Sequence, residues 1–160
     1  MSFTAHPLAA DKSEAYRELA QQLTALIGDE RDMIANAANT AALLFEQLPD
    51  LNWAGFYLLK DGELVLGPFQ GKPACIRIPL GRGVCGTAAA TRRSQVVADV
   101  HAFPGHIACD AASRSELVVP LLHGDELIGV IDLDSPVPGR FDGVDQAGIE
   151  AVAAIFVGSL

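Results

Sequence analysis

Three cysteines are the residues of this sequence best suited to chemistry. Cys75, Cys85 and Cys109 lie in one stretch that is rich in glycine and proline. Cys85 follows a glycine turn and opens a run of small residues typical of a helix, where free N–H groups and the positive helix end favour a thiolate. Cys109 lies in a segment with neither strand nor helix period, and such loops often carry catalytic groups. We therefore expect exposed, reactive thiols at Cys85 and Cys109, the alternative being three unrelated buried cysteines.

Acidic and aromatic side chains mark two predicted strands. Alternation along Ile131–Asp134 places Asp132 and Asp134 on one face of a strand. The same alternation places Trp53 and Tyr57 on one face of an earlier strand, where they could line a pocket. A solvated sheet face explains the acids equally well, and an ordinary core explains the aromatic residues.

The elements that must position these residues follow the order helices, strands, closing helix. Apolar residues at helical spacing predict helices over 12–27 and 29–48, the first capped by Asp11 and ended by Gly28. The period then changes to that of strands, with hairpin signals at Asp61-Gly62 and near Gly124. The predicted strands cover 53–59, 63–66, 74–79, 95–98, 117–122 and 127–134, and further helices cover 83–91 and 142–158. This order predicts an α+β fold in which a central antiparallel sheet has the N- and C-terminal helices packed on one face.

Length and composition bound the class of protein. The 160 residues suit one domain over 1–160, with N-terminal helices in 1–50, the sheet and active-site loops in 51–135 and a C-terminal helix in 142–158. Three cysteines and no signal-peptide pattern predict a cytoplasmic protein without a disulfide framework. No apolar run approaches the roughly 20 residues needed to span a bilayer. A net charge of −9 disfavours nucleic acid as a partner, which leaves a small polar ligand or a protein.

Metal and nucleotide sites are not expected. His101, His106 and His123 could join the cysteines around zinc, but there is no CxxC pair and the cysteine spacings are long and irregular. The glycine-rich stretch Gly81–Gly86 lacks the Gly-Lys-Ser/Thr ending that holds nucleotide phosphates.

Five segments of the chain closely resemble the free methionine-(R)-sulfoxide reductases, which are single-domain enzymes of the GAF fold. The resemblance covers roughly residues 30–158, includes all three cysteines, and has loop motifs long enough to separate these enzymes from GAF sensor domains. The segments are Trp53–Leu59, Gly67–Cys75, Gly83–Ala88, Val100–Glu116 and Asp132–Pro136.

The resemblance implies a thiol-based reduction of free L-methionine-(R)-sulfoxide to L-methionine. Cys109 matches the nucleophile, which becomes a sulfenic acid, and Cys75 matches the thiol that condenses with it to a disulfide. Cys85 is then an alternative resolving thiol or a stabilising residue near the site. No bound cofactor is implied, because an external dithiol such as thioredoxin, ultimately supplied by NADPH, reopens the disulfide.

The resemblance also assigns roles around the thiols. Glu116, Asp132 and Asp134 match an acidic cluster that binds the substrate ammonium, and Glu116 or Asp134 is the expected proton donor. Trp53 and Tyr57 match residues that shape the sulfoxide pocket. The alternative function is a GAF domain that binds a small ligand or senses redox state without turnover. We expect the reductase, because the chain shows no output domain to receive a signal, and a homodimer would suit its apolar N-terminal helices.

Overall fold

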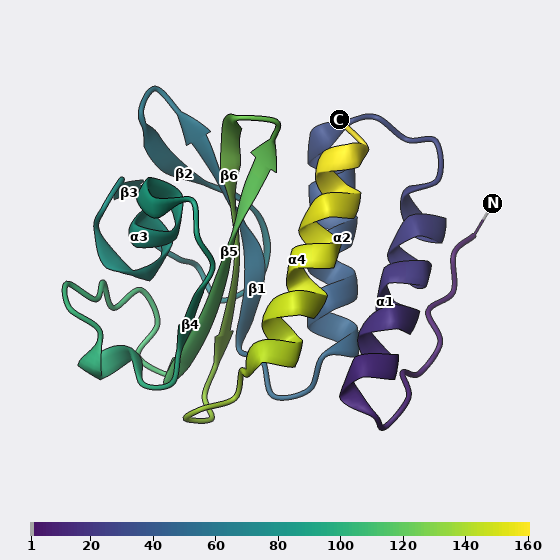
Figure 1. Cartoon of the computed structure of the whole chain (residues 1–160), viewed down its shortest axis with the longest axis horizontal. Helices are drawn as coiled ribbons and strands as arrows, with labels where there is room; N and C mark the ends of the chain where they lie inside the picture. The colour runs from purple at the N-terminus through teal and green to yellow at the C-terminus, as the bar shows by residue number, and fades with distance from the viewer. Residues whose placement is uncertain (1) are drawn as a thin grey trace.

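The computed structural model describes residues 2–160 and consists of a sheet with helices on both faces. On one face, α2 (Met33–Gln47) and α4 (Gly143–Gly158) pack directly on the strands, and α1 (Lys12–Ile27) lies outside them (Figure 1). On the other face lies α3 (Gly83–Thr91). The predicted α+β fold, with the terminal helices on one face, is confirmed, and α1 forms an additional outer layer. None of the helices within residues 2–160 is long and apolar enough to cross a membrane.

The sheet contains six antiparallel strands in the order β3-β2-β1-β6-β5-β4. Both predicted hairpins form, and in the first the left-handed conformations of Asp61 and Gly62 make the tight turn. Because β1 and β6 are neighbours at the centre of the sheet, the β1–β2 hairpin and the β5–β6 hairpin lie side by side. The strands are β1 (Trp53–Lys60), β2 (Glu63–Gly71), β3 (Arg77–Pro79), β4 (Gln95–Val97), β5 (Ser115–His123) and β6 (Glu126–Ser135).

The two faces of the sheet belong to two separate apolar clusters. Phe56 and Leu133 point toward α2 and α4, into the larger cluster. Trp53 and Tyr57 point to the opposite face, into a smaller cluster with residues of α3. Because successive strand residues alternate between faces, this division follows from the sequence pattern as predicted.

Helix boundaries follow the caps. The Asp11 carboxylate accepts a hydrogen bond from the Glu14 N–H at the start of α1, and Gly28 ends that helix with φ of 55°. The second helix begins at Met33 rather than near Asp29, because the Asp32 side chain caps it through the Ala35 N–H. In α4, Asp142 and Asp145 form a reciprocal capping box.

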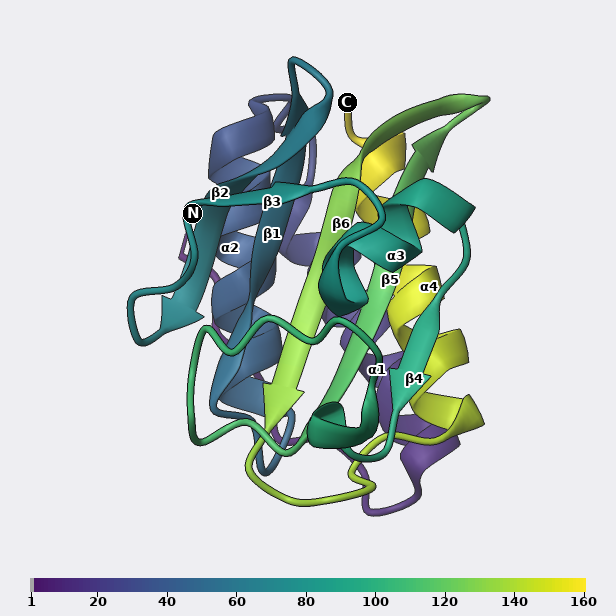
Figure 2. The same ribbon diagram turned by 90° about the vertical axis from the view of Figure 1, so that its left-hand side faces the viewer.

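The chain between β4 and β5 crosses the sheet face that also carries α3. A short 3-10 helix, η1 (Val100–Ala102), begins this segment, and residues 103–114 then follow an irregular path (Figure 2). The segment that joins β2 to β3 lies at the same face. β3 is confined to Arg77–Pro79 and is shorter than predicted, so Cys75 belongs to this segment rather than to a strand. Two irregular segments, one carrying Cys75 and the other Cys109, therefore meet over the sheet.

Candidate active site

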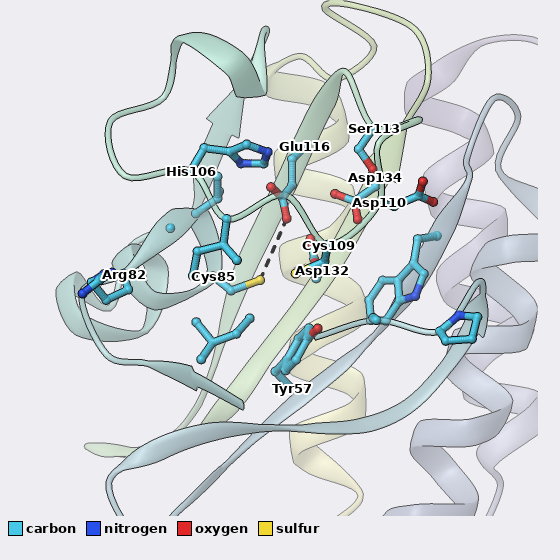
Figure 3. Close-up of a pocket in the computed structure, with 17 residues that line it drawn as sticks. Tyr57, Arg82, Cys85, His106, Cys109, Asp110, Ser113, Glu116, Asp132 and Asp134 are labelled. Carbon is cyan, nitrogen blue, oxygen red and sulfur yellow. Dashed lines mark hydrogen bonds between the residues drawn. The ribbon is translucent and has the colours of Figure 1, made fainter. Parts of the chain in front are cut away.

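A cavity of about 40 Å³ lies between the sheet, the start of α3 and the loop 103–113. The residues that line it come from β1, β5, β6, α3 and both cysteine-bearing loops (Figure 3). All three cysteines or their loops, the acidic residues and both predicted aromatic residues meet here. Of the residues assigned to the active site from the sequence, all except Cys75 line this cavity, and Cys75 is bonded to the lining residue Cys109. The contributing segments lie up to 81 residues apart, from Trp53 to Asp134.

Strand register explains why the acidic side chains converge. Glu116 of β5 pairs directly with Asp134 of β6, and Asp134 pairs on its other side with Trp53 of β1. Asp132 lies two residues along β6 and therefore on the same face. Glu116 is 7% exposed, Asp132 is 5% exposed and Asp134 is half-buried. Like charges opposite one another destabilise a sheet, which favours a functional role for the cluster over a structural one.

The acidic cluster lacks a cationic partner in the part of the chain that the structure describes. Among residues 2–160, none of the ion pairs involves Glu116, Asp132 or Asp134. Burial, followed by repulsion from the neighbouring carboxylates, raises the pKa of Glu116 and of Asp134 well above the ordinary range. Burial also raises the pKa of Asp132, although the neighbouring Glu116 and Cys85 side chains oppose the shift. Asp132 Oδ1 is buried and has no hydrogen-bond partner among the described residues, so the cluster is suited to receive a ligand cation or donor.

Cys85 lies beneath this cluster and differs from the sequence expectation. Its side chain is 4% exposed, and its Sγ lies 3.9 Å from Glu116 Oε2 (Figure 3). The prediction of an exposed Cys85 thiolate is wrong, because α3 packs its first turn onto the sheet. Burial and the adjacent carboxylates raise the pKa of the thiol well above its usual value. One potential ligand atom from each of Cys85, Glu116 and Asp132 lies within 4.8 Å of the others, so these three could hold a metal ion.

Cys75 and Cys109 form a disulfide at the edge of the pocket. Their Cα atoms are 5.4 Å apart, although the two residues are separated by 34 positions in the sequence. Both cysteines are half-buried, whereas Cys85 is buried and free. The pairing implied by the family resemblance is therefore present, and the expectation that the Cys109 loop leaves its sulfur accessible holds in part.

The aromatic residues of β1 support the segment that carries Cys75. The Tyr57 hydroxyl donates a hydrogen bond to the Cys75 carbonyl oxygen at 2.9 Å, and Trp53 Nε1 donates to the Lys72 carbonyl oxygen at 3.1 Å. The Trp53 ring also stacks between the rings of Tyr57 and Phe69, with centroid distances of 5.8 Å and 5.2 Å. These residues therefore line the pocket and hold one of its loops.

Sequence reasoning missed several lining residues. Arg82, His106, Asp110 and Ser113 border the cavity. Arg82 had been noted only as part of the glycine-rich turn before Cys85, and His106 only as a possible zinc ligand in the loop that carries Cys109. The nearest sequence signal for Asp110 and Ser113 was their place in the same loop as Cys109. His123 lies at the end of β5 and does not line the pocket.

Comparison with known proteins defines the class first: residues 34–156 match the family described as GAF domain. The chain is 56% identical to free methionine-R-sulfoxide reductase of Escherichia coli K12, over 90% of this chain and 87% of that protein. It is 41% identical to the Saccharomyces cerevisiae protein of the same name, over 91% of this chain and 85% of that one.

A solved structure gives the same result. The X-ray structure of free methionine-R-sulfoxide reductase from Neisseria meningitidis, in complex with its substrate, matches with a TM-score of 0.95 and 47% identity, covering 99% of this chain and 95% of that one. The chain therefore belongs to the GAF domain family of free methionine-R-sulfoxide reductases.

Proposed function

We propose that this protein reduces free L-methionine-(R)-sulfoxide to L-methionine, with Cys109 as the nucleophile and Cys75 as the resolving thiol. The observation that carries the proposal is the Cys75–Cys109 disulfide, which borders a cavity lined by buried carboxylates. Two thiols from distant loops, an acidic cluster and the family relationship are the parts that this reaction needs.

The first step transfers oxygen to the protein. The Cys109 thiolate attacks the sulfoxide sulfur, and a carboxylic acid protonates the sulfoxide oxygen. The sulfur–oxygen bond of the substrate breaks, the oxygen passes to Cys109 as a sulfenic acid, and methionine is released as the reduced product. Glu116 and Asp134 are suited to donate the proton, because their raised pKa values keep a protonated acid available near neutral pH.

The second step removes the oxygen as water. The Cys75 thiol attacks the Cys109 sulfenic sulfur, so that a disulfide forms and hydroxide takes up a proton. An external dithiol then reduces this disulfide by exchange and becomes oxidised in its place. Thioredoxin is our proposed reductant, and Cys85, buried beside the acids, is a further thiol close to the site.

The acidic cluster also accounts for a preference for the free amino acid. Asp132, whose Oδ1 has no partner, and the carboxylates beside it can bind the α-ammonium of the substrate. Acylation of that nitrogen in a peptide removes its charge and leaves the acids unpaired. Trp53 and Tyr57 provide an apolar wall for the side chain next to this polar end.

The decisive experiment incubates the purified protein with each epimer of free methionine sulfoxide and a dithiol, and measures methionine. We expect turnover of the R epimer, little turnover of the S epimer, and poor reduction of N-acetylmethionine sulfoxide. Binding of the R epimer without release of methionine would instead support a ligand-sensing GAF domain. Equal rates on the free and acetylated substrates would contradict the role given to the acidic cluster.

Three further proposals concern the setting of the reaction. Thioredoxin as reductant is tested by coupling turnover to NADPH through thioredoxin reductase. A homodimer is supported by exposed apolar side chains on α2, Ile34 and Phe45, and sedimentation would test it. A cytoplasmic location agrees with a free buried Cys85, and cell fractionation would test it.

A further inference from the structure

The loop that carries Cys109 is attached to the rest of the protein by few polar contacts. Within residues 2–160, the hydrogen bonds of segment 103–113 either stay inside it, reach back to Val100 or come from the side chain of Asn52. The Cys75–Cys109 disulfide is the covalent attachment. The next residue, Arg114, donates its N–H to the Ser135 carbonyl oxygen of β6 and so fixes the end of the loop to the sheet. When the disulfide is reduced, Asn52 is therefore the polar group that still holds the part of the loop next to Cys109.

Asn52 precedes β1 and contacts two elements of the site at once. Its Nδ2 donates to Asp110 Oδ2 at 3.0 Å and to Ser113 Oγ at 3.1 Å. Its backbone N–H donates to the carbonyl oxygen of Asp134 at 3.0 Å. Asn52 therefore links the loop that carries Cys109 to β6, the strand that carries Asp134.

The orientation of the Asn52 amide follows from its partner. A carboxylate accepts hydrogen bonds and cannot donate them, so the NH₂ group must face Asp110. The consequence is that Asn52 Oδ1 is buried and meets no hydrogen-bond partner within residues 2–160. A buried oxygen without a partner lowers stability. The amide therefore contributes less to the stability of the fold than a fully paired one, which favours a role in holding the loop. Asp110 is itself fixed, because its Oδ1 accepts from the Ala112 N–H and its carbonyl accepts from the Ser113 N–H.

We propose that Asn52 is a positioning residue, whose amide holds the Cys109 loop in register with the Asp134 strand throughout the redox cycle. The expected effect of Asn52 on kcat rests on the proposed function. Its expected effect on the equilibrium between the two thiols and the disulfide needs no turnover. By keeping Cys109 near Cys75 after reduction, the Asn52 amide raises the effective concentration of one thiol toward the other and so favours the disulfide.

The first test replaces the donor by an acceptor of the same shape. Asn52→Asp should lower kcat for free methionine-(R)-sulfoxide by about 10–100-fold, with KM within about threefold of the parent, because the loop moves but the ammonium-binding acids do not. In a glutathione redox buffer, the equilibrium constant for forming the Cys75–Cys109 disulfide should fall by about tenfold. Asn39→Asp, the same change at an exposed position of α2, should alter neither quantity.

The second test exchanges the two partners. Asp110→Asn alone should lower the disulfide equilibrium constant, because an amide that keeps its oxygen on the Ala112 N–H turns a donor toward the donor of Asn52. Combining Asn52→Asp with Asp110→Asn restores one donor and one acceptor across the same gap. The double variant should therefore recover most of the disulfide equilibrium constant, and this coupling separates the hydrogen bond from a general loss of stability.

Two outcomes would overturn the proposal. One is a parental disulfide equilibrium constant and a parental kcat in Asn52→Asp. The other is a double variant no better than the worse single variant in the redox buffer, which would show that the Asn52–Asp110 hydrogen bond does not carry the effect. Because the redox equilibrium is measured without substrate, it tests the role of Asn52 even if the protein fails to reduce methionine sulfoxide.

Discussion

Replacing Glu116 by glutamine should make the unliganded protein more stable at neutral pH while impairing its activity. Glu116 is buried, forms no ion pair within residues 2–160, and lies opposite Asp134 in the sheet. The glutamine amide is of nearly the same shape, and its oxygen can take the place of Glu116 Oε2 as the acceptor for the Cys85 thiol. The substitution therefore removes one ionisable group, and any charge that it carries, from the cluster and changes little else.

The size of the effect follows from the separation of the groups. Carboxylate oxygens of Glu116 and Asp132 lie within 4.8 Å of each other. At an effective dielectric constant of about 20, two full charges at that separation repel by about 3.5 kcal/mol. Protonation of one acid in the parent relieves part of this repulsion, so we expect Glu116→Gln to raise the free energy of unfolding by about 1–3 kcal/mol at pH 7.

The pH dependence gives the prediction a definite sign. The pKa of Glu116 is raised in the folded protein, mainly by burial, above the ordinary value of 4.5. The folded state therefore binds the proton more tightly, and the stability gained from this proton is fully present below pH 4.5 and is lost as the pH rises through the raised pKa. The advantage of Glu116→Gln over the parent should accordingly be small at pH 4 and should grow toward pH 8.

Urea denaturation of both proteins from pH 4 to pH 8 measures this difference directly. Glu126→Gln, at an exposed position at the start of β6, serves as the control and should leave the difference near zero throughout. A Glu116→Gln variant that is less stable than the parent at pH 7, or a difference that shrinks as the pH rises, would refute the view that these acids repel one another in the folded protein.

Three other predictions concern the thiols, the donor and the sheet. Cys109→Ser should abolish even a single turnover, whereas Cys75→Ser should release about one methionine per site and lose most thioredoxin-coupled cycling unless Cys85 substitutes, as quenched-flow assays would show. Among the amides of Glu116, Asp132 and Asp134, loss of the proton donor should lower kcat by about 10²–10⁴-fold, whereas loss of an ammonium partner should mainly raise KM in steady-state assays. Gly129→Ala should reduce the free energy of unfolding by about 2–4 kcal/mol in urea, because its Cβ would overlap the Tyr57 carbonyl oxygen, while Gly143→Ala meets nothing nearby and serves as control.

Local patterns in the sequence predicted most of the fold. Alternation correctly placed Asp132 and Asp134 opposite Ile131 and Leu133, because a residue of a strand can point only to one face or the other. The start of the second helix was less accurate. Asp29 and Asp32 are both acceptable caps, and the choice of Asp32 depends on which carboxylate reaches an N–H of the first turn.

The site was predictable only where a motif or the resemblance described it. Burial of Cys85 depends on how α3 packs against the sheet, and no local pattern reports that contact. Asn52 gave no signal either, because its partners Asp110 and Ser113 lie 58 and 61 residues away in the sequence. The sequence could identify groups capable of chemistry, but the residues that hold them in place are fixed by long-range contacts.

The disulfide form of the site has implications for the order of events. In this form the cavity measures about 40 Å³, and the Cys109 sulfur beside it is bonded to Cys75. Trp53 and Tyr57 hold the Cys75 segment inward, and the disulfide draws the Cys109 loop against it. The sulfur of the proposed nucleophile is therefore unavailable for as long as the disulfide persists. Reduction by the external dithiol must come before the next attack on a sulfoxide, because only a free Cys109 thiolate can act as the nucleophile.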